Sequence, residues 1–182
     1  TILSSSTDMD MDPAKSQGLP TTSNGYIFRR LTTWKGDRKG QTKVVPDLAT
    51  DTGTTTDGGR TWKYTLKKGL KYEDGTSITS QDIKYGLERS FADSLTGGLS
   101  YHKTLLEGAQ NYHGPFDGKS LDSIETPDSR TIVFHLNSPF GDWPWVASMA
   151  TFTPVPKDKG SVQGYGKKPV SSGPYKVETN ES

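Results

Sequence analysis

Residues 61–91 carry the periodicities of a strand and of a helix in direct succession. Apolar side chains alternate with polar ones over residues 61–66, which is the period of a half-buried strand; they are Trp62, Tyr64 and Leu66. After the turn-forming residues 73–76, Thr79 is placed to cap a helix and Asp82 lies in its first turn. The helical face that follows consists of Ile83, Leu87 and Phe91. A chain that holds both patterns is not an all-helical bundle.

The same alternation returns at residues 131–136, where Ile132, Phe134 and Leu136 share one side. Ser, Thr, Gly and Pro make up about two fifths of the 182 residues, and they favour strands, turns and caps over long helix interiors. Leu, Ile, Val and Phe are scarce, but 18 aromatic residues supply apolar area in their place. We therefore predict an α+β fold, thinly packed and rich in loops, with a mixed sheet and short peripheral helices.

Several further elements are expected from local signals. We predict short helices at residues 22–31, 100–110 and 142–149, a turn at residues 126–128, and strands within residues 1–11 and 173–177. Residues 29–43 hold six basic residues and one acid around two glycines. We interpret them as a solvated connecting loop, with an anion-binding or nucleic-acid-binding patch as the less favoured alternative.

Charge and cysteine content exclude several classes of function. Twenty-two basic residues balance 21 acidic ones, which argues against nucleic-acid binding or membrane-surface binding as the main activity. The chain has no cysteine, so it forms no disulfide and no Cys-ligated metal site. It also contains no apolar run of about 18 residues, and residues 1–5 lack the features of a signal peptide. We expect a soluble chain from which any export signal has been removed.

The sequence shows no catalytic or metal-binding pattern of recognisable spacing. Its three histidines lie too far apart for the usual ligand motifs, and nucleotide-binding and nucleophile-elbow motifs are absent. Glu73 and Asp74 are adjacent carboxylates, which leaves a carbohydrate-active enzyme open as an alternative, although Asp-Gly is first of all a turn former. Tyr101, Trp143 and Trp145 lie in turn-rich contexts, where a structural role is the default and a groove wall for a flexible ligand is the alternative.

A long stretch of the chain resembles the signature of the family 5 extracellular solute-binding proteins, the oligopeptide- and dipeptide-binding receptors of ABC importers. The stretch is WKYTLKKGLKYEDGT at residues 62–76, followed by ITSQDIKYGLER at residues 78–89. Further markers of the family appear in order along the chain. They are Met11-Asp12-Pro13, residues 45–49 (VPDLA), residues 131–136 (TIVFHL) before residues 138–140 (SPF), residues 154–157 (PVPK) and residues 172–175 (SGPY).

The resemblance implies a bilobed fold similar to that of periplasmic binding proteins, of which this sequence is an N-terminal fragment. Residues 1–42 and 173–182 would belong to the ligand-facing core of the N-terminal lobe. Residues 43–172 would form an appended subdomain of the same lobe, and the second lobe would be absent. The chain would not be an enzyme and would need no cofactor or metal.

The resemblance also implies a function, which is the binding of peptides by their main chain between two closing lobes, for uptake through a membrane permease. Gln17, Gly18 and Leu19 resemble the family's early ligand-side loop, and Tyr101 resembles a tyrosine that reaches toward the cleft. We expect a monomer that binds no nucleic acid and lies outside the cell or in the periplasm, anchored as a lipoprotein in its full-length form. A receptor for short oligosaccharides or nickel complexes is the alternative on the same scaffold.

Overall fold

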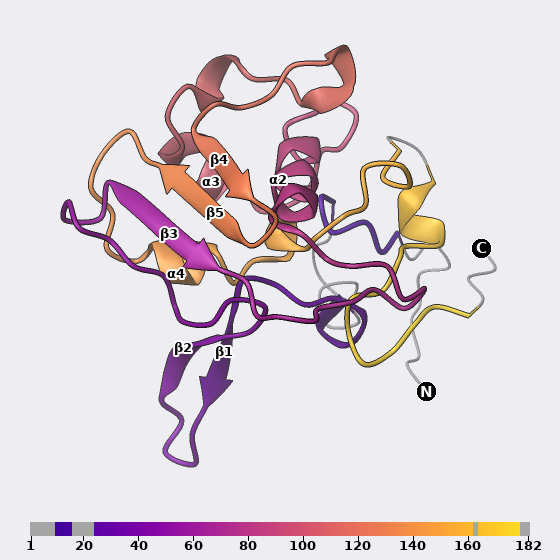
Figure 1. Cartoon of the computed structure of the whole chain (residues 1–182), viewed down its shortest axis with the longest axis horizontal. Coiled ribbons are helices and arrows are strands. Elements are labelled where there is room, and N and C mark those ends of the chain that lie inside the picture. Colours follow the sequence, from indigo (N-terminus) through magenta and orange to yellow (C-terminus); the bar gives the residue numbers. More distant parts are fainter. Residues whose placement is uncertain (1–9, 16–23, 162–163, 179–182) are drawn as a thin grey trace.

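The computed structural model describes residues 10–15, 24–161 and 164–178, and Figure 1 shows the whole chain. Its strands are β1 (Thr32–Gly36), β2 (Thr42–Pro46), β3 (Thr61–Thr65), β4 (Ile124–Asp128) and β5 (Thr131–His135). Its α-helices are α2 (Ser80–Arg89), α3 (Tyr101–Leu105) and α4 (Trp143–Val146). Short 3₁₀ helices lie at Ala109–Asn111, Pro115–Asp117, Ala150–Phe152 and Tyr165–Lys167. The predicted α+β class is confirmed.

A three-stranded antiparallel sheet in the order β3-β5-β4 carries the main core. Its alternating side chains meet across the ladder, because Trp62 pairs with Phe134 and Tyr64 pairs with Ile132. All four side chains are buried on the same face, whereas Lys63 and Val133, the residues between them, are not buried. Both strands predicted from the alternation are therefore confirmed.

Helix α2 covers this sheet and begins where the sequence predicts (Figure 1). The Asp82 carboxylate accepts hydrogen bonds from the backbone N–H of Thr79 (2.8 Å) and from its hydroxyl (3.0 Å). These bonds satisfy donors that the first turn leaves unpaired. Ile83 and Leu87 are buried in the core together with Phe91, which follows the helix.

Residues 32–46 form an antiparallel β-hairpin, not the connecting loop that we predict from their charges. Trp34 pairs with Val44, and Thr33 pairs with Val45, so the β-forming residues of the two strands face each other. The Asp37 carboxylate closes the turn by accepting hydrogen bonds from the N–H groups of Lys39 and Gln41. The loop was predicted from the charged residues alone. The pairing of β-forming residues in the two strands stabilises a hairpin in spite of those charges.

Three other local predictions need correction. The turn expected at residues 126–128 lies at residues 129–130, because β4 continues to Asp128, whose carboxylate accepts hydrogen bonds from the N–H groups of Arg130 and Thr131. Pro127 is tolerated because β4 is an edge strand.

The helix expected at residues 22–31 is described only at residues 24–27, and Ile27 and Leu31 belong to separate core clusters. Residues 173–177 form no strand.

The other predicted helices are present but short. The segment predicted at residues 100–110 divides into α3 and the 3₁₀ helix Ala109–Asn111, separated by Gly108 with φ of 70°. Residues 142–149 contain α4. Most of the strand predicted within residues 1–11 lies outside the described residues. No helix in the described part of the chain is long and apolar enough to cross a membrane.

Candidate functional site

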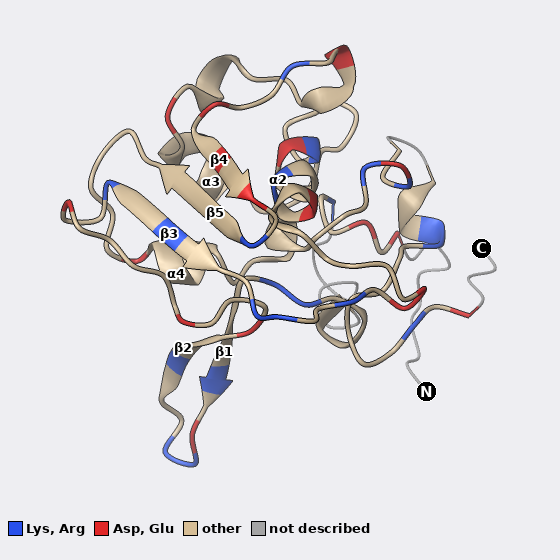
Figure 2. Cartoon of the chain, in the orientation of Figure 1, with Lys and Arg blue, Asp and Glu red and all other residues tan. Residues whose placement is uncertain are grey.

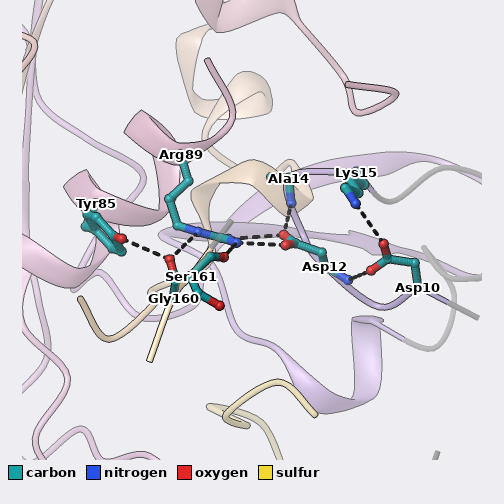
Figure 3. Close-up of polar contacts among 8 residues, drawn as sticks. All are labelled: Asp10, Asp12, Ala14, Lys15, Tyr85, Arg89, Gly160 and Ser161. Carbon is teal, nitrogen blue, oxygen red and sulfur yellow. Dashed lines mark hydrogen bonds and ion pairs between the residues drawn. The ribbon is translucent and has the colours of Figure 1, made fainter. Parts of the chain in front are cut away.

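A buried ion pair holds the segment that precedes the predicted ligand-side loop. The guanidinium of Arg89, at the end of α2, donates two parallel hydrogen bonds to the carboxylate of Asp12, from Nη1 to Oδ1 (3.1 Å) and from Nη2 to Oδ2 (2.7 Å) (Figure 3). The Arg89 side chain is fully buried, and that of Asp12 is almost so. This forked geometry gives the strongest kind of side-chain hydrogen bond.

Arg89 also donates two hydrogen bonds to backbone carbonyls. Nε donates to the carbonyl of Gly160 (3.0 Å), and Nη2 donates to the carbonyl of Ser161 (2.8 Å). The guanidinium lies 4.9 Å from the centre of the Tyr165 ring, and Tyr85 donates its hydroxyl proton to the same Gly160 carbonyl. Figure 3 shows that Arg89 thereby joins three segments far apart in the sequence. Four hydrogen bonds and an ion pair are the kind of environment that a buried charge requires.

The ion pair also sets the course of the chain after Asp12. Asp12 Oδ1 accepts a hydrogen bond from the backbone N–H of Ala14 (2.9 Å), and Ala14 packs against Ala92 and Leu95. The backbone at Gly98 approaches so closely that a Cβ there would lie 2.2 Å from the carbonyl oxygen of Ala14. Only glycine permits this approach. The chain three residues before Gln17 is thus in contact with the chain three residues before Tyr101.

Of the four predicted site residues, the structure describes one, Tyr101. Gln17, Gly18 and Leu19 lie outside the described residues. Tyr101 is the first residue of α3, and 59% of its surface is exposed. Tyr101 therefore has a surface that a ligand can reach, and Ala14 and Gly98 bring together the backbone leading to both predicted segments.

His102, the next residue along, anchors α3 in the core. Its ring is fully buried, with Nε2 2.7 Å from Ser90 Oγ and edge-on contacts to Phe91 and Phe152. Ser90 Oγ donates its single proton to the Leu87 carbonyl, so His102 Nε2 carries the proton and donates to Oγ. Burial, together with the nearby Lys103 cation, lowers the pKa of His102 to about 3. The imidazole is therefore neutral, and its contacts with Ser90, Phe91 and Phe152 fix the start of α3 against the core.

Acid should destabilise the fold through His102. An unfolded histidine has a pKa of about 6.5, so between pH 6.5 and pH 3 the unfolded chain binds a proton that the native chain excludes. This contribution to stability is fully present above pH 6.5 and is lost at roughly 1 kcal/mol per pH unit as the pH falls. Urea unfolding at pH 7, 6 and 5 should show a shallower pH slope for His102→Gln. His113→Gln, at an exposed histidine, should keep the native slope, and equal slopes for all three proteins would contradict this assignment.

An open aromatic surface lies between the hairpin and α4. Trp34 and Trp145 are 58% and 39% exposed, and with Leu99 they line a cavity of about 550 Å³ whose rim includes Arg30 and Met149. Leu99 is two residues from Tyr101 in the sequence, but Tyr101 itself does not line this cavity. Trp143, in contrast, is fully buried among Phe134 and Phe152. The default structural role is confirmed for Trp143, whereas Trp145 lines the cavity.

The carboxylates of Glu73 and Asp74 are engaged in local structure. Glu73 Oε1 accepts a hydrogen bond from the backbone N–H of Ser171 (2.9 Å). Asp74 forms an ion pair with Lys159 and accepts hydrogen bonds from Thr76, and these contacts lower the pKa of Asp74. In the described part of the chain, no three His, Asp or Glu residues gather as metal ligands would. The geometry gives the carbohydrate-active alternative no support.

Arg89, His102 and the aromatic surface were not predicted as site components from the sequence. Arg89 falls in the family signature, but nothing local shows that it pairs with a residue 77 positions earlier. The β-forming residues at positions 32–34 and 42–45, on either side of the glycines at 36 and 40, were the signal that could have indicated the hairpin.

Comparison with known families identifies the class of protein that has this fold. The family model described as "Bacterial extracellular solute-binding proteins, family 5 Middle" matches residues 43–182. The chain therefore belongs to the family 5 bacterial extracellular solute-binding proteins.

Named relatives and solved structures are consistent with this membership. The chain is 28% identical over 157 residues to the periplasmic murein peptide-binding protein MppA of Escherichia coli K12, covering 84% of this chain and 28% of the relative. It is 25% identical over 131 residues to the oligopeptide-binding protein OppA of Bacillus subtilis 168, covering 68% of this chain and 24% of that one.

Among solved structures, the clavulanic acid biosynthesis oligopeptide binding protein 2 superposes with a TM-score of 0.88 at 39% identity, over 96% of this chain and 32% of that one. The chain thus spans about a quarter to a third of the proteins that it matches. The expectation of one lobe of a bilobed fold is confirmed.

Proposed function

We propose that this chain is the N-terminal part of the substrate-binding component of an ABC importer, and that it binds peptides for uptake. The observation that carries the proposal is the superposition of 96% of the chain on an oligopeptide-binding protein at 39% identity. The names of the relatives MppA and OppA point to the same ligand class. Recognition runs through the peptide main chain, because an extended segment can pair with any sequence that presents its N–H and C=O groups.

Gln17, Gly18, Leu19 and Tyr101 are the residues that we propose contact the peptide. The close approach of Ala14 and Gly98 supports this proposal, because each lies three residues before one of the two segments. The exposed ring of Tyr101 then supplies an apolar face with a polar tip, which suits a ligand of variable side chains. The division into a core of residues 1–42 and 173–182 and a subdomain of residues 43–172 is part of the same proposal.

The proposal extends to location and partners. The protein acts as a monomer outside the cell or in the periplasm, carries a lipid anchor in its full-length form, catalyses no reaction, and delivers its ligand to a membrane permease. The family description and the periplasmic relatives support the location. The structural engagement of Glu73 and Asp74 supports the absence of hydrolysis.

Calorimetry on the complete reading frame that encodes this chain tests the proposal. Mixed tetrapeptides should bind the complete protein, whereas short oligosaccharides and nickel complexes should not. The 182-residue chain alone should give no measurable heat with the same peptides, because a single lobe cannot exclude water from the bound ligand. Tight binding by the chain alone, or oligosaccharide binding in place of peptide binding, would overturn this view.

In the complete protein, Tyr101→Ala should weaken tetrapeptide binding by about tenfold, since an aromatic contact at a binding surface contributes on the order of 1 kcal/mol or more. Phe116→Ala removes another exposed aromatic ring from a separate 3₁₀ helix and should leave the Kd within about twofold. Equal affinities for Tyr101→Ala and the unaltered protein would remove Tyr101 from the site and leave the peptide-binding function itself untouched.

A further inference from the structure

The β1-β2 hairpin extends away from the body of the molecule and concentrates positive charge (Figure 2). Residues 32–46 contain four basic residues, Lys35, Arg38, Lys39 and Lys43, and a single acid, Asp37. All five are exposed. The hairpin therefore carries a net charge of +3, and the rest of the chain carries −2.

The charges of the hairpin are not neutralised internally. The Asp37 carboxylate is used by the turn, where it accepts the N–H groups of Lys39 and Gln41 at 2.8 and 2.9 Å. Within the described residues, none of the four hairpin cations forms an ion pair. These cations are available to an external anion.

Two of the cations oppose each other directly. Lys35 and Lys43 are register partners in the antiparallel ladder, so their side chains leave the same face of the hairpin at neighbouring positions. Like charges at such a pair disfavour the hairpin, and an anion between them would turn the repulsion into attraction. An unfavourable pairing of like charges that is kept at an exposed position commonly marks a functional surface.

This face is hollowed. A cavity of about 690 Å³ lies against it, lined by Lys35, Arg38 and Lys43, with Val45 contributing an apolar wall. Asp37 also lines the cavity, but its carboxylate is engaged by the N–H groups of the turn. The volume suits several side chains of a polypeptide, and a guanidinium with two ammonium groups suits carboxylates. We propose that this face of the hairpin binds an acidic polypeptide segment of a partner protein, through the Asp and Glu side chains of that segment.

The geometry favours a polypeptide over the two other common polyanions. A membrane-binding surface presents aromatic and basic side chains to the same plane, but alternation places Trp34 on the opposite face from Lys35 and Lys43. A nucleic-acid-binding surface interleaves aromatic side chains for base stacking, and the lining of this cavity includes none. The inference does not depend on the peptide-binding function.

Fluorescence anisotropy with a labelled hexa-glutamate peptide, capped at both ends, tests the inference on the 182-residue chain at low salt. The variant Lys35→Gln/Arg38→Gln/Lys43→Gln should raise the Kd by about tenfold or more. The matched control Lys63→Gln/Lys68→Gln/Lys157→Gln removes the same charge from exposed positions elsewhere and should change the Kd by less than about twofold. Circular dichroism should show native secondary structure for both variants.

Three results would overturn the inference. The first is the absence of hexa-glutamate binding by the unaltered chain, and the second is an equal loss of affinity in the two variants, which would indicate attraction by overall charge. The third is hairpin-dependent binding to phosphatidylglycerol vesicles, or to a single-stranded oligonucleotide, that is tighter than binding to the peptide. Salt should weaken peptide binding steeply, as expected for a charge-dominated contact.

Discussion

Replacing Arg89 with Met should lower the free energy of unfolding by about 3–5 kcal/mol, measured by urea denaturation. The substitution leaves the Asp12 carboxylate buried without its forked partner, and it removes the hydrogen bonds that the guanidinium donates to the carbonyls of Gly160 and Ser161. An unpaired buried charge costs far more than the pair contributes when intact. This ion pair is therefore the polar contact on which the described packing depends most.

Two further variants separate this mechanism from a general effect of removing an arginine. Arg60→Met, at an exposed arginine, should change stability by less than about 0.5 kcal/mol. Asp12→Leu/Arg89→Met should recover part of the loss, because no charge then remains buried, although the hydrogen bonds from Arg89 to the carbonyls of Gly160 and Ser161 are still lost. A loss below about 1 kcal/mol for Arg89→Met would show that the pair does not hold the fold.

Trp143→Ala should have an effect of similar size, about 3–5 kcal/mol. The indole is fully buried, and its ring centre lies 5.2 Å from that of Phe134 and 5.7 Å from that of Phe152. Truncation removes this large apolar surface and opens a cavity that the strands and helices around it cannot fill. Urea denaturation followed by circular dichroism measures the loss.

Trp145 provides a matched control two residues along the same helix. It is 39% exposed and lines the open aromatic surface, so Trp145→Ala should cost less than about 1 kcal/mol. Equal losses for the two tryptophans would mean that the core does not close around Trp143 as described. The two tryptophans also show that residues two positions apart in an α-helix point in different directions, here one to the core and one to solvent.

The strands and the capped helix of the core were predictable because their signals are local. The alternation at residues 61–66 and 131–136 fixes which side chains can share a face, and the Thr79/Asp82 spacing fixes where α2 begins. The family was also predictable, since its signature lies in these same residues. Gln17, Gly18, Leu19, Tyr101 and the domain boundaries stay predictions.

The hairpin and the turn after β4 were mispredicted for one physical reason. In residues 29–43 the charge pattern is local, but the pairing of Trp34 with Val44 depends on a partner ten residues away. At residues 126–128, the proline suggested a turn, yet an edge strand accepts it where the register of the ladder shifts, between Glu125 and Asp128. In both cases pairing with another strand outweighed the local preference.

The sequence by itself determined the periodic elements, the balance of charge and the family, because each of these depends on neighbouring residues or on composition. Only the tertiary structure decided that Arg89 meets Asp12, that Ala14 meets Gly98, and that Trp143 is buried while Trp145 is exposed. These contacts join residues distant in the chain, and their stability comes from packing and desolvation in the folded core. No local pattern encodes that environment.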